Sequence, residues 1–384
     1  MSELIDQSLS SILERTFRGR RILVTGHNGF VGSWLSLILA NAGAQLTGLS
    51  LPSAPGCLSD SLALSESLTS IEGDVTIPAT VQQVVEECAP EFVFHLAAQA
   101  LVFPSYTDPG MTFATNVMGT VNVLDSLRQQ QSVRSCVIVT SDKCYSVVDG
   151  VHVETDPLGG DDPYSASKAA AEIVAHAYRV SFFEKGQLGL ATARAGNIVG
   201  GGDWAEYRIV PDLARAVRDG IPVVLRQPDA IRPWQHVLDA VAGYLRLSDA
   251  LVRDRPTYSQ AWNFGPNASA AANVGELVKG LVDNWRSKGD LVREPTLEKA
   301  PVRERVVLAL DSDKAHRLLG WNPLLDLDTT IDWTVDWYRE AINSSSFNAR
   351  DITNRQIVRF LEIDRATKRG EASLAAGFEP IVRD

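Results

Sequence analysis

The sequence lacks most features that would place it at a membrane or outside the cell. No run approaches the roughly 18 uncharged apolar residues that a bilayer-spanning helix needs. Residues 1–17 contain acids and have no apolar core of a secretory signal. Only four cysteines occur, and their spacing is not that of a metal site: Cys57, Cys88, Cys136 and Cys144. These absences predict reduced thiols, a cytoplasmic location and no bound metal.

The chain also lacks an excess of positive charge. Its 47 acidic and 36 basic residues give a net charge of −11, and the pI is near 5.1. Nucleic acid requires a basic face, so it is not expected as a partner. A small phosphorylated substrate needs only a few local arginines and stays compatible with this charge. A length of 384 residues indicates two packed lobes or one enlarged α/β domain.

The first half of the chain alternates short apolar runs with helical patterns. Runs this apolar are typical of strands buried on both faces of a parallel sheet. They predict a doubly wound α/β domain of the Rossmann type over residues 18–194. The strand candidates are residues 21–25, 45–50, 91–97, 135–141 and 188–194.

The alternation stops after Arg194. Residues 195–345 combine glycine-rich loops, helical stretches and short strands, and they predict a smaller C-terminal lobe with some return into the first domain. Residues 346–384 are expected to form a C-terminal extension. Residues 1–17 and roughly 350–384 are expected to be appendages, and the last of these contain a polar stretch expected to be a mobile tail.

A glycine triplet follows the first predicted strand directly. Gly26, Gly29 and Gly32 lie where a strand passes into a helix. Bare backbone can approach a pyrophosphate there, and the helix N-terminus favours its negative charge. The alternative is a tight strand–helix turn without a ligand.

The end of the second predicted strand departs from the usual dinucleotide site. That position often carries Asp or Glu for the adenosine ribose, but residues 48–52 read GLSLP. No Arg or Lys follows to receive a 2′-phosphate, which favours NAD over NADP. Asp74 is placed to contact the adenine end, unless it is only a loop carboxylate.

Tyr164 and Lys168 are spaced to share one helix face. An isolated tyrosine has a pKa of about 10, and a neighbouring ammonium together with a cationic nicotinamide ring would lower it. Such a tyrosine can take the proton from a hydroxyl while its carbon loses hydride. The pair follows Thr140 and Ser141 by about 23 residues, which makes a chance match improbable.

These motifs, together with residues 95–99 (HLAAQ), resemble the extended short-chain dehydrogenases/reductases. Within that family the sequence looks like the CDP-glucose 4,6-dehydratases, over roughly residues 18–340. The stretches that carry the resemblance are TGHNGFVGSWLSL, FHLAAQALV, TNVMGTVNVLD, VTSDKCY, DDPYSASKAAAE, ARAGNIVGGGDWA and IRPWQHVLD.

The resemblance implies an NAD-dependent lyase that acts on CDP-glucose. Tyr164, assisted by Ser141 and Lys168, would deprotonate the C4 hydroxyl while hydride passes to NAD. The 4-ketone acidifies the C5 hydrogen, and Asp142 would protonate the departing C6 hydroxyl before hydride returns to C6. The acid must carry its proton, which burial in a closed site favours.

Lys143 has two readings in this scheme. In related dTDP-glucose dehydratases the residue after the acid is a glutamate regarded as the C5 base. A neutral lysine can also act as a base, or Lys143 can merely orient Asp142 or the ketone oxygen.

The resemblance also assigns binding residues. Cofactor contacts are expected from Gly26, Asn28, Gly29, Phe30, Gly32, Asp74, Val75, Leu96, Ala97, Ala98, Tyr164 and Lys168, and substrate contacts from Gln99, Asn197, Arg208, Arg232 and Glu304. The arginines suit phosphate oxygens but can equally form interlobe ion pairs. Trp204 and Trp234 can shape the pocket or belong to the core. The family's usual His-Glu-Ala reads Arg-Glu-Arg at residues 303–305, which weakens the expected ribose recognition.

Three alternatives stay open at this point. A nucleotide-sugar 4-epimerase needs no acid at C6, so Asp142 and Lys143 favour dehydration. A non-catalytic NAD-binding sensor would not need Ser141, Tyr164 and Lys168 together. A dehydratase with another nucleotide or sugar preference is not excluded by the sequence. The resemblance further implies a homodimer or dimer of dimers through helices near 109–131 and 164–185, whose apolar faces can instead be covered within one chain.

Overall fold

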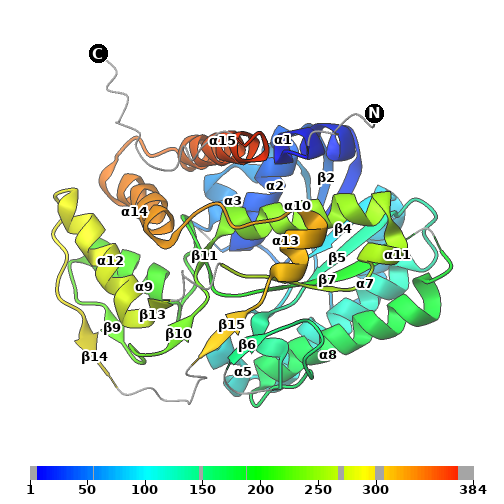
Figure 1. Ribbon diagram of the computed structural model, residues 1–384, viewed down its shortest axis with the longest axis horizontal. Coiled ribbons are helices and arrows are strands. Elements are labelled where there is room, and N and C mark those ends of the chain that lie inside the picture. Colours follow the sequence, from blue (N-terminus) through cyan, green and yellow to red (C-terminus); the bar gives the residue numbers. More distant parts are fainter. Residues whose placement is uncertain are drawn as a thin grey trace.

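The computed structural model describes residues 7–54, 56–146, 150–186, 188–266, 272–298 and 307–370. Its centre is a seven-stranded sheet in the order β12-β7-β5-β4-β1-β2-β3, and every neighbouring pair runs parallel (Figure 1). This is the predicted doubly wound, Rossmann-type fold. The strands are β1 (Arg21–Thr25), β2 (Gln45–Ser50), β3 (Thr69–Glu72), β4 (Phe92–His95), β5 (Ser135–Val139), β7 (Gly189–Ala195) and β12 (Ala261–Phe264).

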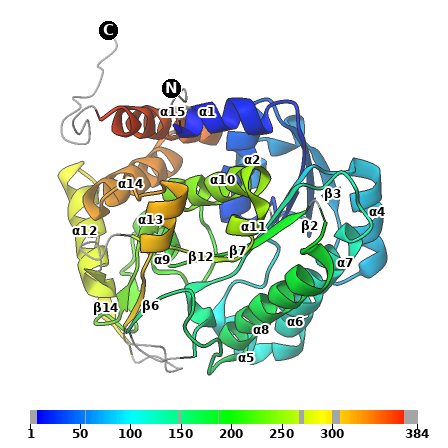
Figure 2. The same ribbon diagram turned by 45° about the vertical axis from the view of Figure 1, so that its right-hand side comes forward.

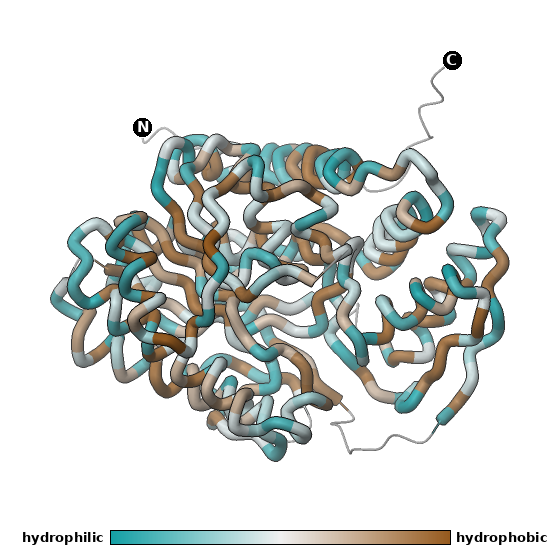
Figure 3. The backbone as a smooth tube through the Cα atoms, turned by 180° about the vertical axis from the view of Figure 1, so that it is seen from behind, coloured by the Kyte–Doolittle hydropathy of each residue, from teal (hydrophilic) through white to brown (hydrophobic). Residues whose placement is uncertain are grey.

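The inner strands form because their side chains are apolar on both faces. Every residue of β4 and β7 is buried, and the apolar colour is concentrated in the central strands in Figure 3. The five predicted strands are all present, and β1 and β2 have the predicted bounds. Two further strands complete the sheet at its edges, β3 and β12.

Helices cover both faces of the sheet, as Figure 2 shows. On one face, α4 (Pro78–Cys88), α7 (Gly119–Leu127) and α8 (Pro163–Tyr178) enclose an apolar cluster. On the other, α2 (Phe30–Asn41) and α10 (Val237–Arg253) pack against each other and the sheet. Shorter helices are α3 (Leu58–Ser61), α5 (Val102–Thr107), α6 (Pro109–Phe113), α11 (Arg255–Tyr258) and α13 (Asp313–Leu319).

The smaller lobe is built from α9 (Ile209–Asp219), α12 (Val274–Ser287) and α14 (Leu327–Asn343). Four two-stranded pairs connect it internally and to the sheet domain: β6 (Gly150–His152) with β15 (Leu308–Leu310), β8 (Ile198–Val199) with β11 (Gln235–His236), β9 (Val224–Leu225) with β14 (Thr296–Leu297), and β10 (Ile231–Arg232) with β13 (Ala272–Asn273). The chain returns from this lobe to the first domain through α10 and β12, because α10 packs on β5 and β7 and β12 pairs with β7.

The two terminal segments are packed, in contrast to the expected appendages. α1 (Leu9–Ile12) and α15 (Ala349–Lys368) lie side by side over α10 (Figure 1). The Leu9 amide donates to Asp364 Oδ2 at 2.5 Å, and Arg246 forms an ion pair with Asp364 at 2.5 Å, with both side chains at most 4% exposed. Sequence reading missed this because the apolar residues of both segments are interspersed with charges. The predicted mobile tail lies mostly outside the described residues.

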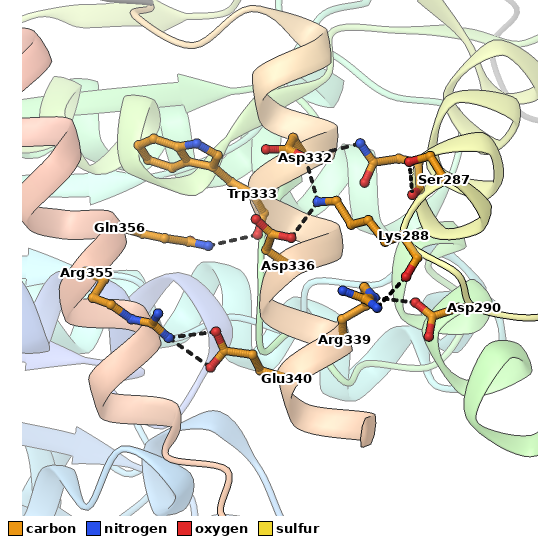
Figure 4. A network of polar contacts seen from close by, with 11 residues as sticks. Ser287, Lys288, Asp290, Asp332, Trp333, Asp336, Arg339, Glu340, Arg355 and Gln356 are labelled. Carbon is orange, nitrogen blue, oxygen red and sulfur yellow. Dashed lines mark hydrogen bonds and ion pairs between the residues drawn. The ribbon is translucent and has the colours of Figure 1, made fainter. Parts of the chain in front are cut away.

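Polar contacts join α12, α14 and α15 (Figure 4). Lys288 binds Asp332 and Asp336 on α14, and Arg355 of α15 binds Glu340 at 2.7 Å. These pairs are partly exposed, so each contributes at most about 1 kcal/mol. Within the described residues, no helix is long and apolar enough to cross a membrane.

Candidate active site

A cavity of about 610 Å³ lies at the carboxyl ends of the central strands, between the sheet and the smaller lobe. Its walls come from the loop after β1, the ends of β4, β5 and β7, the start of α8, and the segment around α9 and β10. The sheet order reverses between β1 and β4. In open α/β sheets this switch point is where dinucleotides and other ligands bind.

The glycine loop closes tightly at this switch point. Gly26 has φ +76°, its amide donates to the Leu49 carbonyl at 2.8 Å, and its carbonyl accepts from the Gly29 amide at 3.0 Å. A Cβ at Gly26 would lie 2.7 Å from the Ala97 nitrogen, and one at Gly32 would lie 2.1 Å from the Gly26 oxygen. The glycines therefore leave the backbone of the loop bare at the N-terminus of α2. This geometry fits a pyrophosphate against a helix N-terminus.

A histidine fills the space between the glycine loop and strands β2 and β3. The His27 ring is buried, bonds the Ser70 hydroxyl at 2.8 Å, and lies where a Cβ at Gly48 would meet it at 2.4 Å. Burial lowers the pKa of His27. Asn28 donates to the Leu51 carbonyl at 3.0 Å and does not line the cavity. His27 and Asn28 thus shape the loop through contacts within the protein.

The other predicted cofactor residues all lie on the cavity wall. Asp74 accepts a hydrogen bond from the Thr76 amide at 2.8 Å, so one of its oxygens orders its own loop. The wall also contains Ser50, which sequence reading did not single out. The predicted members on this wall are Gly26, Gly29, Phe30, Gly32, Asp74, Val75, Leu96, Ala97, Ala98, Tyr164 and Lys168.

Tyr164 enters the cavity from the first turn of α8. The turn is fixed by its N-cap Asp162, which accepts from the Ser165 amide at 2.9 Å. The Tyr164 hydroxyl is hydrogen-bonded to Ser141. Burial raises the pKa of Tyr164 to about 12, and the Ser141 hydrogen bond opposes this. Within the protein alone, desolvation outweighs the groups that favour the phenolate. The expected lowering also involves the nicotinamide ring and stays a prediction.

Lys168 lies one turn further along α8. Its ammonium donates to the Val139 carbonyl at 3.2 Å, at the end of β5. Burial lowers the pKa of Lys168 to about 8, while the Glu172 carboxylate opposes the shift. A lysine tuned in this way is poised to exchange a proton near neutral pH.

Asp142 lies on a short 3-10 turn, Asp142–Cys144, that follows β5. Ser141 caps the turn: its hydroxyl donates to Asp142 Oδ1 at 2.9 Å and accepts from the Lys143 amide at 3.2 Å. Asp142 is 2% exposed and Lys143 is half-buried. All five predicted catalytic residues line the one cavity, whereas Cys144 packs in the core behind them.

The smaller lobe supplies the facing wall. Asn197, Arg208 and Arg232 all line the cavity. Arg208 pairs with Asp203 at 2.9 Å; burial by itself disfavours the guanidinium charge, but the carboxylate raises the pKa of Arg208 above its usual range. Arg232 is 4% exposed and donates to the Ile231 carbonyl at 2.9 Å. Glu304 lies outside the described residues.

The two tryptophans differ in role. Trp234 lines the cavity and donates its indole N–H to the Ala272 carbonyl at 3.0 Å. Trp204 packs edge-on against Tyr338 at 5.1 Å, which places it with the core.

Gln99 is not on the cavity wall. Its side chain donates to the Leu101 carbonyl at 2.9 Å and the Thr112 hydroxyl at 3.0 Å, and it accepts from the Leu101 amide at 2.6 Å. Sequence reading missed the neighbouring aromatic pair Phe103 and Tyr207, whose ring centroids lie 4.8 Å apart on the cavity wall. An isolated tyrosine in a polar loop gives no sequence signal.

Together the fold and cavity define a dinucleotide-binding enzyme with a Tyr-x-x-x-Lys pair and a neighbouring carboxylic acid. The sequence profile of the family described as GDP-mannose 4,6 dehydratase matches residues 23–334. The chain belongs to this family.

Individual relatives agree. The chain is 40% identical to a CDP-glucose 4,6-dehydratase of Salmonella typhimurium (strain LT2) over 341 residues, which cover 86% of this chain and 94% of that protein. It is 27% identical to a dTDP-glucose 4,6-dehydratase of Xanthomonas campestris pv. campestris, over 82% of this chain and 92% of that one. The predicted resemblance to 4,6-dehydratases is confirmed.

Solved structures share the fold. MoeE5 in complex with UDP-glucose and NAD is 26% identical with a TM-score of 0.69, and the match covers 84% of this chain and 99% of that one. A UDP-glucose 4-epimerase of Thermotoga maritima has a TM-score of 0.73 over 84% of this chain and 99% of that one. At 22% identity, this second likeness shows the fold alone.

Proposed function

We propose that the protein is a CDP-glucose 4,6-dehydratase that converts CDP-D-glucose to CDP-4-keto-6-deoxy-D-glucose and water. The observation that carries this proposal is the position of Asp142. It lies on the turn beside Ser141 and shares a cavity with Tyr164 and Lys168. Oxidation at C4 requires the serine, tyrosine and lysine, while elimination across C5 and C6 also requires an acid. The 40% identity to the Salmonella CDP-glucose enzyme supports this nucleotide.

The chain's own residues move the protons. Tyr164 takes the proton of the C4 hydroxyl, held by its hydrogen bond to Ser141. NAD, held by the glycine loop and the cavity wall, would supply the redox chemistry, the transfer of hydride from C4 and back to C6. The C4 ketone makes the C5 hydrogen acidic. A base, for which Lys143 on the same turn is the candidate, removes it as a proton while Asp142 protonates the C6 hydroxyl, which leaves as water. A proton then adds at C5, and the reaction has no net change in oxidation state.

We infer NAD as the cofactor from the lining of the cavity. The side-chain-free loop at Gly26 and Gly29 suits the pyrophosphate. Ser50 and Leu51 line the cavity at the end of β2, where a 2′-phosphate would need a cation. Residues 18–194 would hold NAD and residues 195–345 the nucleotide sugar. Asn197, Arg208, Arg232 and Glu304 are the proposed substrate contacts, since guanidinium groups pair well with diphosphate oxygens.

We also propose a homodimer or a dimer of dimers. The helical segments 109–127 and 163–183 carry apolar side chains that are between 38% and 58% exposed, namely Met111, Phe113, Met118, Ile173, Val180 and Phe182. Exposed apolar side chains on helices that pack against each other are the material from which an interface is built. Light scattering should give a multiple of the 41.7 kDa chain, and Ile173→Glu should shift it toward monomer. The four free cysteines support a cytoplasmic location.

The test is incubation of purified protein and NAD with CDP-, dTDP-, GDP- and UDP-glucose in parallel. Formation of a 4-keto-6-deoxy sugar is followed by its absorbance in alkali. We expect product from CDP-glucose at the highest kcat/KM. No product from any sugar would contradict the dehydratase assignment, and faster turnover of another sugar would contradict the assigned nucleotide.

A further inference from the structure

A buried ion pair lies behind the catalytic turn, outside the cavity wall. Glu172 of α8 and Arg194 of β7 are 2.8 Å apart, and their side chains are 3% and 4% exposed. Removing two charges from water costs several kcal/mol per ion unless hydrogen bonds satisfy the remaining atoms. The partners of this pair therefore indicate what it holds in place.

Both oxygens of Glu172 are occupied. Oε1 accepts from the Thr140 hydroxyl at 2.5 Å, and Oε2 accepts from the Thr192 hydroxyl at 2.7 Å as well as from Arg194. Burial by itself would raise the pKa of Glu172, but Arg194 and the hydroxyl donors hold it below its usual range. The carboxylate is thus a fixed, ionised anchor.

Arg194 extends the network toward a second point. Its Nη1 donates to the Tyr145 hydroxyl at 2.9 Å and to the Glu154 carbonyl at 3.1 Å. The Tyr145 hydroxyl in turn donates to Asn263 Oδ1 at 2.6 Å, on β12. Tyr145 is fully buried, so these hydrogen bonds replace the contacts that its hydroxyl would make with water.

The two anchored residues flank the catalytic turn. Thr140 directly precedes Ser141, and Tyr145 directly follows the turn Asp142–Cys144. Glu172 lies four residues after Lys168 on α8, so it shares that helix face. One hydrogen-bond network therefore fixes the residues on both sides of the turn that carries Asp142. It also connects this turn to α8, the helix that carries Tyr164.

We propose that Glu172 and Arg194 are positioning residues that set Asp142 against Tyr164, and that weakening their network slows water elimination more than C4 oxidation. The proposal rests on the dehydratase function above. The helix turn that bears Tyr164 has its own cap, Asp162, and Lys168 donates to the Val139 carbonyl, so neither contact includes a residue of the turn Asp142–Cys144. The turn bearing Asp142 relies on its two flanking anchors. A misplacement of about 1 Å can cost about a hundredfold in rate.

The test compares the two chemical steps in Tyr145→Phe and Thr140→Val, which each remove one hydroxyl anchor, and in Glu172→Gln. With CDP-glucose and NAD, single-turnover absorbance of reduced nicotinamide reports C4 oxidation, and the 4-keto-6-deoxy product reports elimination. We expect elimination to fall about tenfold to a hundredfold. In Tyr145→Phe, which leaves Thr140, Ser141 and Glu172 in place, oxidation should stay within about twofold, so reduced nicotinamide accumulates. Thr140→Val and Glu172→Gln act next to Ser141 and Lys168, so oxidation falls there too, but less than elimination. Thr140→Ser, which keeps the hydroxyl, should restore the wild-type ratio of the two rates.

Two matched controls separate positioning from stability. Asp364→Asn disrupts an equally buried ion pair, with Arg246, away from the cavity. Tyr258→Phe removes a tyrosine hydroxyl away from the cavity, one that donates a hydrogen bond to the Leu318 carbonyl at 3.0 Å. Both should keep the wild-type ratio of elimination to oxidation, even where Asp364→Asn lowers the unfolding temperature.

The outcomes are distinct. If folded Tyr145→Phe and Thr140→Val keep the wild-type ratio, the positioning role is wrong, whatever Glu172→Gln does to folding. If Asp364→Asn changes the ratio as much as they do, the effect is general destabilisation and the proposal also fails. If the wild-type protein makes no product from any nucleotide sugar, the dehydratase function itself is wrong.

Discussion

Gly26 lies against the backbone of Ala97 so closely that a Cβ at Gly26 would stand 2.7 Å from the Ala97 nitrogen. This contact joins the loop after β1 to the loop after β4, at the reversal of strand order. Gly26 also has φ +76°, a backbone conformation that costs an L-residue about 1–2 kcal/mol. The position is therefore closed to side chains for two separate reasons.

Gly26→Ala should consequently abolish measurable NAD binding, because Ala97 would be displaced into the proposed pyrophosphate position. Gly19→Ala is the matched control: Gly19 has φ +69°, but a Cβ there meets nothing within 4 Å. It should cost about 1 kcal/mol of stability and leave NAD binding unchanged. Titration with NAD, followed by tryptophan fluorescence, measures the Kd of both variants. An unchanged Kd in Gly26→Ala would contradict the placement of the dinucleotide.

Asp142→Asn should block elimination while NAD still binds. An asparagine keeps the size of the side chain and can accept the Ser141 hydrogen bond, but it has no acidic proton for the leaving hydroxyl. General acid catalysis contributes about 10²–10⁴-fold, so product formation should fall by that factor. Asp219→Asn on the exposed end of α9 should have no effect. Loss of NAD binding in Asp142→Asn would show that Asp142 serves the cofactor site.

Lys143→Met should abolish exchange of the C5 hydrogen with solvent deuterium if the amine removes that proton. The side chain is half-buried on the same turn as Asp142, which places it within the catalytic cavity. Mass spectrometry of product formed in deuterated water follows the exchange. Lys279→Met, a change on the exposed face of α12, is the control. Persistent exchange with unchanged turnover would show that Lys143 is not the C5 base.

The free energy of unfolding should decrease as the pH is lowered, because His236 is buried. Burial lowers its pKa from 6.5 to about 3, so between these values the unfolded chain binds a proton that the folded protein excludes. The free energy of unfolding should therefore decrease as pH falls below 6.5, by up to about 1.4 kcal/mol per pH unit from this group. His236 also caps α10 by accepting from the Leu238 amide, and asparagine can keep that cap.

Guanidinium unfolding of His236→Asn at several pH values below 7 should accordingly show a shallower slope than the wild type, whatever its absolute stability. His176→Asn, on the exposed side of α8, should retain the wild-type slope. Equal slopes in wild type and His236→Asn would mean that His236 is protonated in the folded state.

The inner sheet could be predicted from the sequence because its strands are continuous apolar runs. The edge strands could not: β3 reads TSIE, and no residue of it is fully buried. β12 is a short strand with the sequence AWNF, and it pairs with β7, a strand far away along the chain. The helix of α15 carries charges around its buried residues, so its docking depends on partners such as Arg246 that lie far away in the sequence.

The site divides in the same way. Tyr164 and Lys168 could be found because their spacing places both on one helix face. The Glu172–Arg194 pair could not, since neither residue type nor spacing shows which two charges will meet in the interior. The upward shift of the Tyr164 pKa in the protein alone is not visible in the sequence for a related reason: desolvation depends on what the rest of the chain packs around the hydroxyl.

The packing of the terminal segments has a practical consequence for engineering. A Cβ at Gly320 would meet both Gln7 Oε1 and Lys368 Nζ at 3.5 Å, so the side chains of residues near the two ends of the described chain reach the same place. A short linker can therefore join them, and circular permutants opened in exposed loops should keep the same topology. Truncation is the opposite case, because deleting α15 would leave the guanidinium of Arg246 buried without its carboxylate.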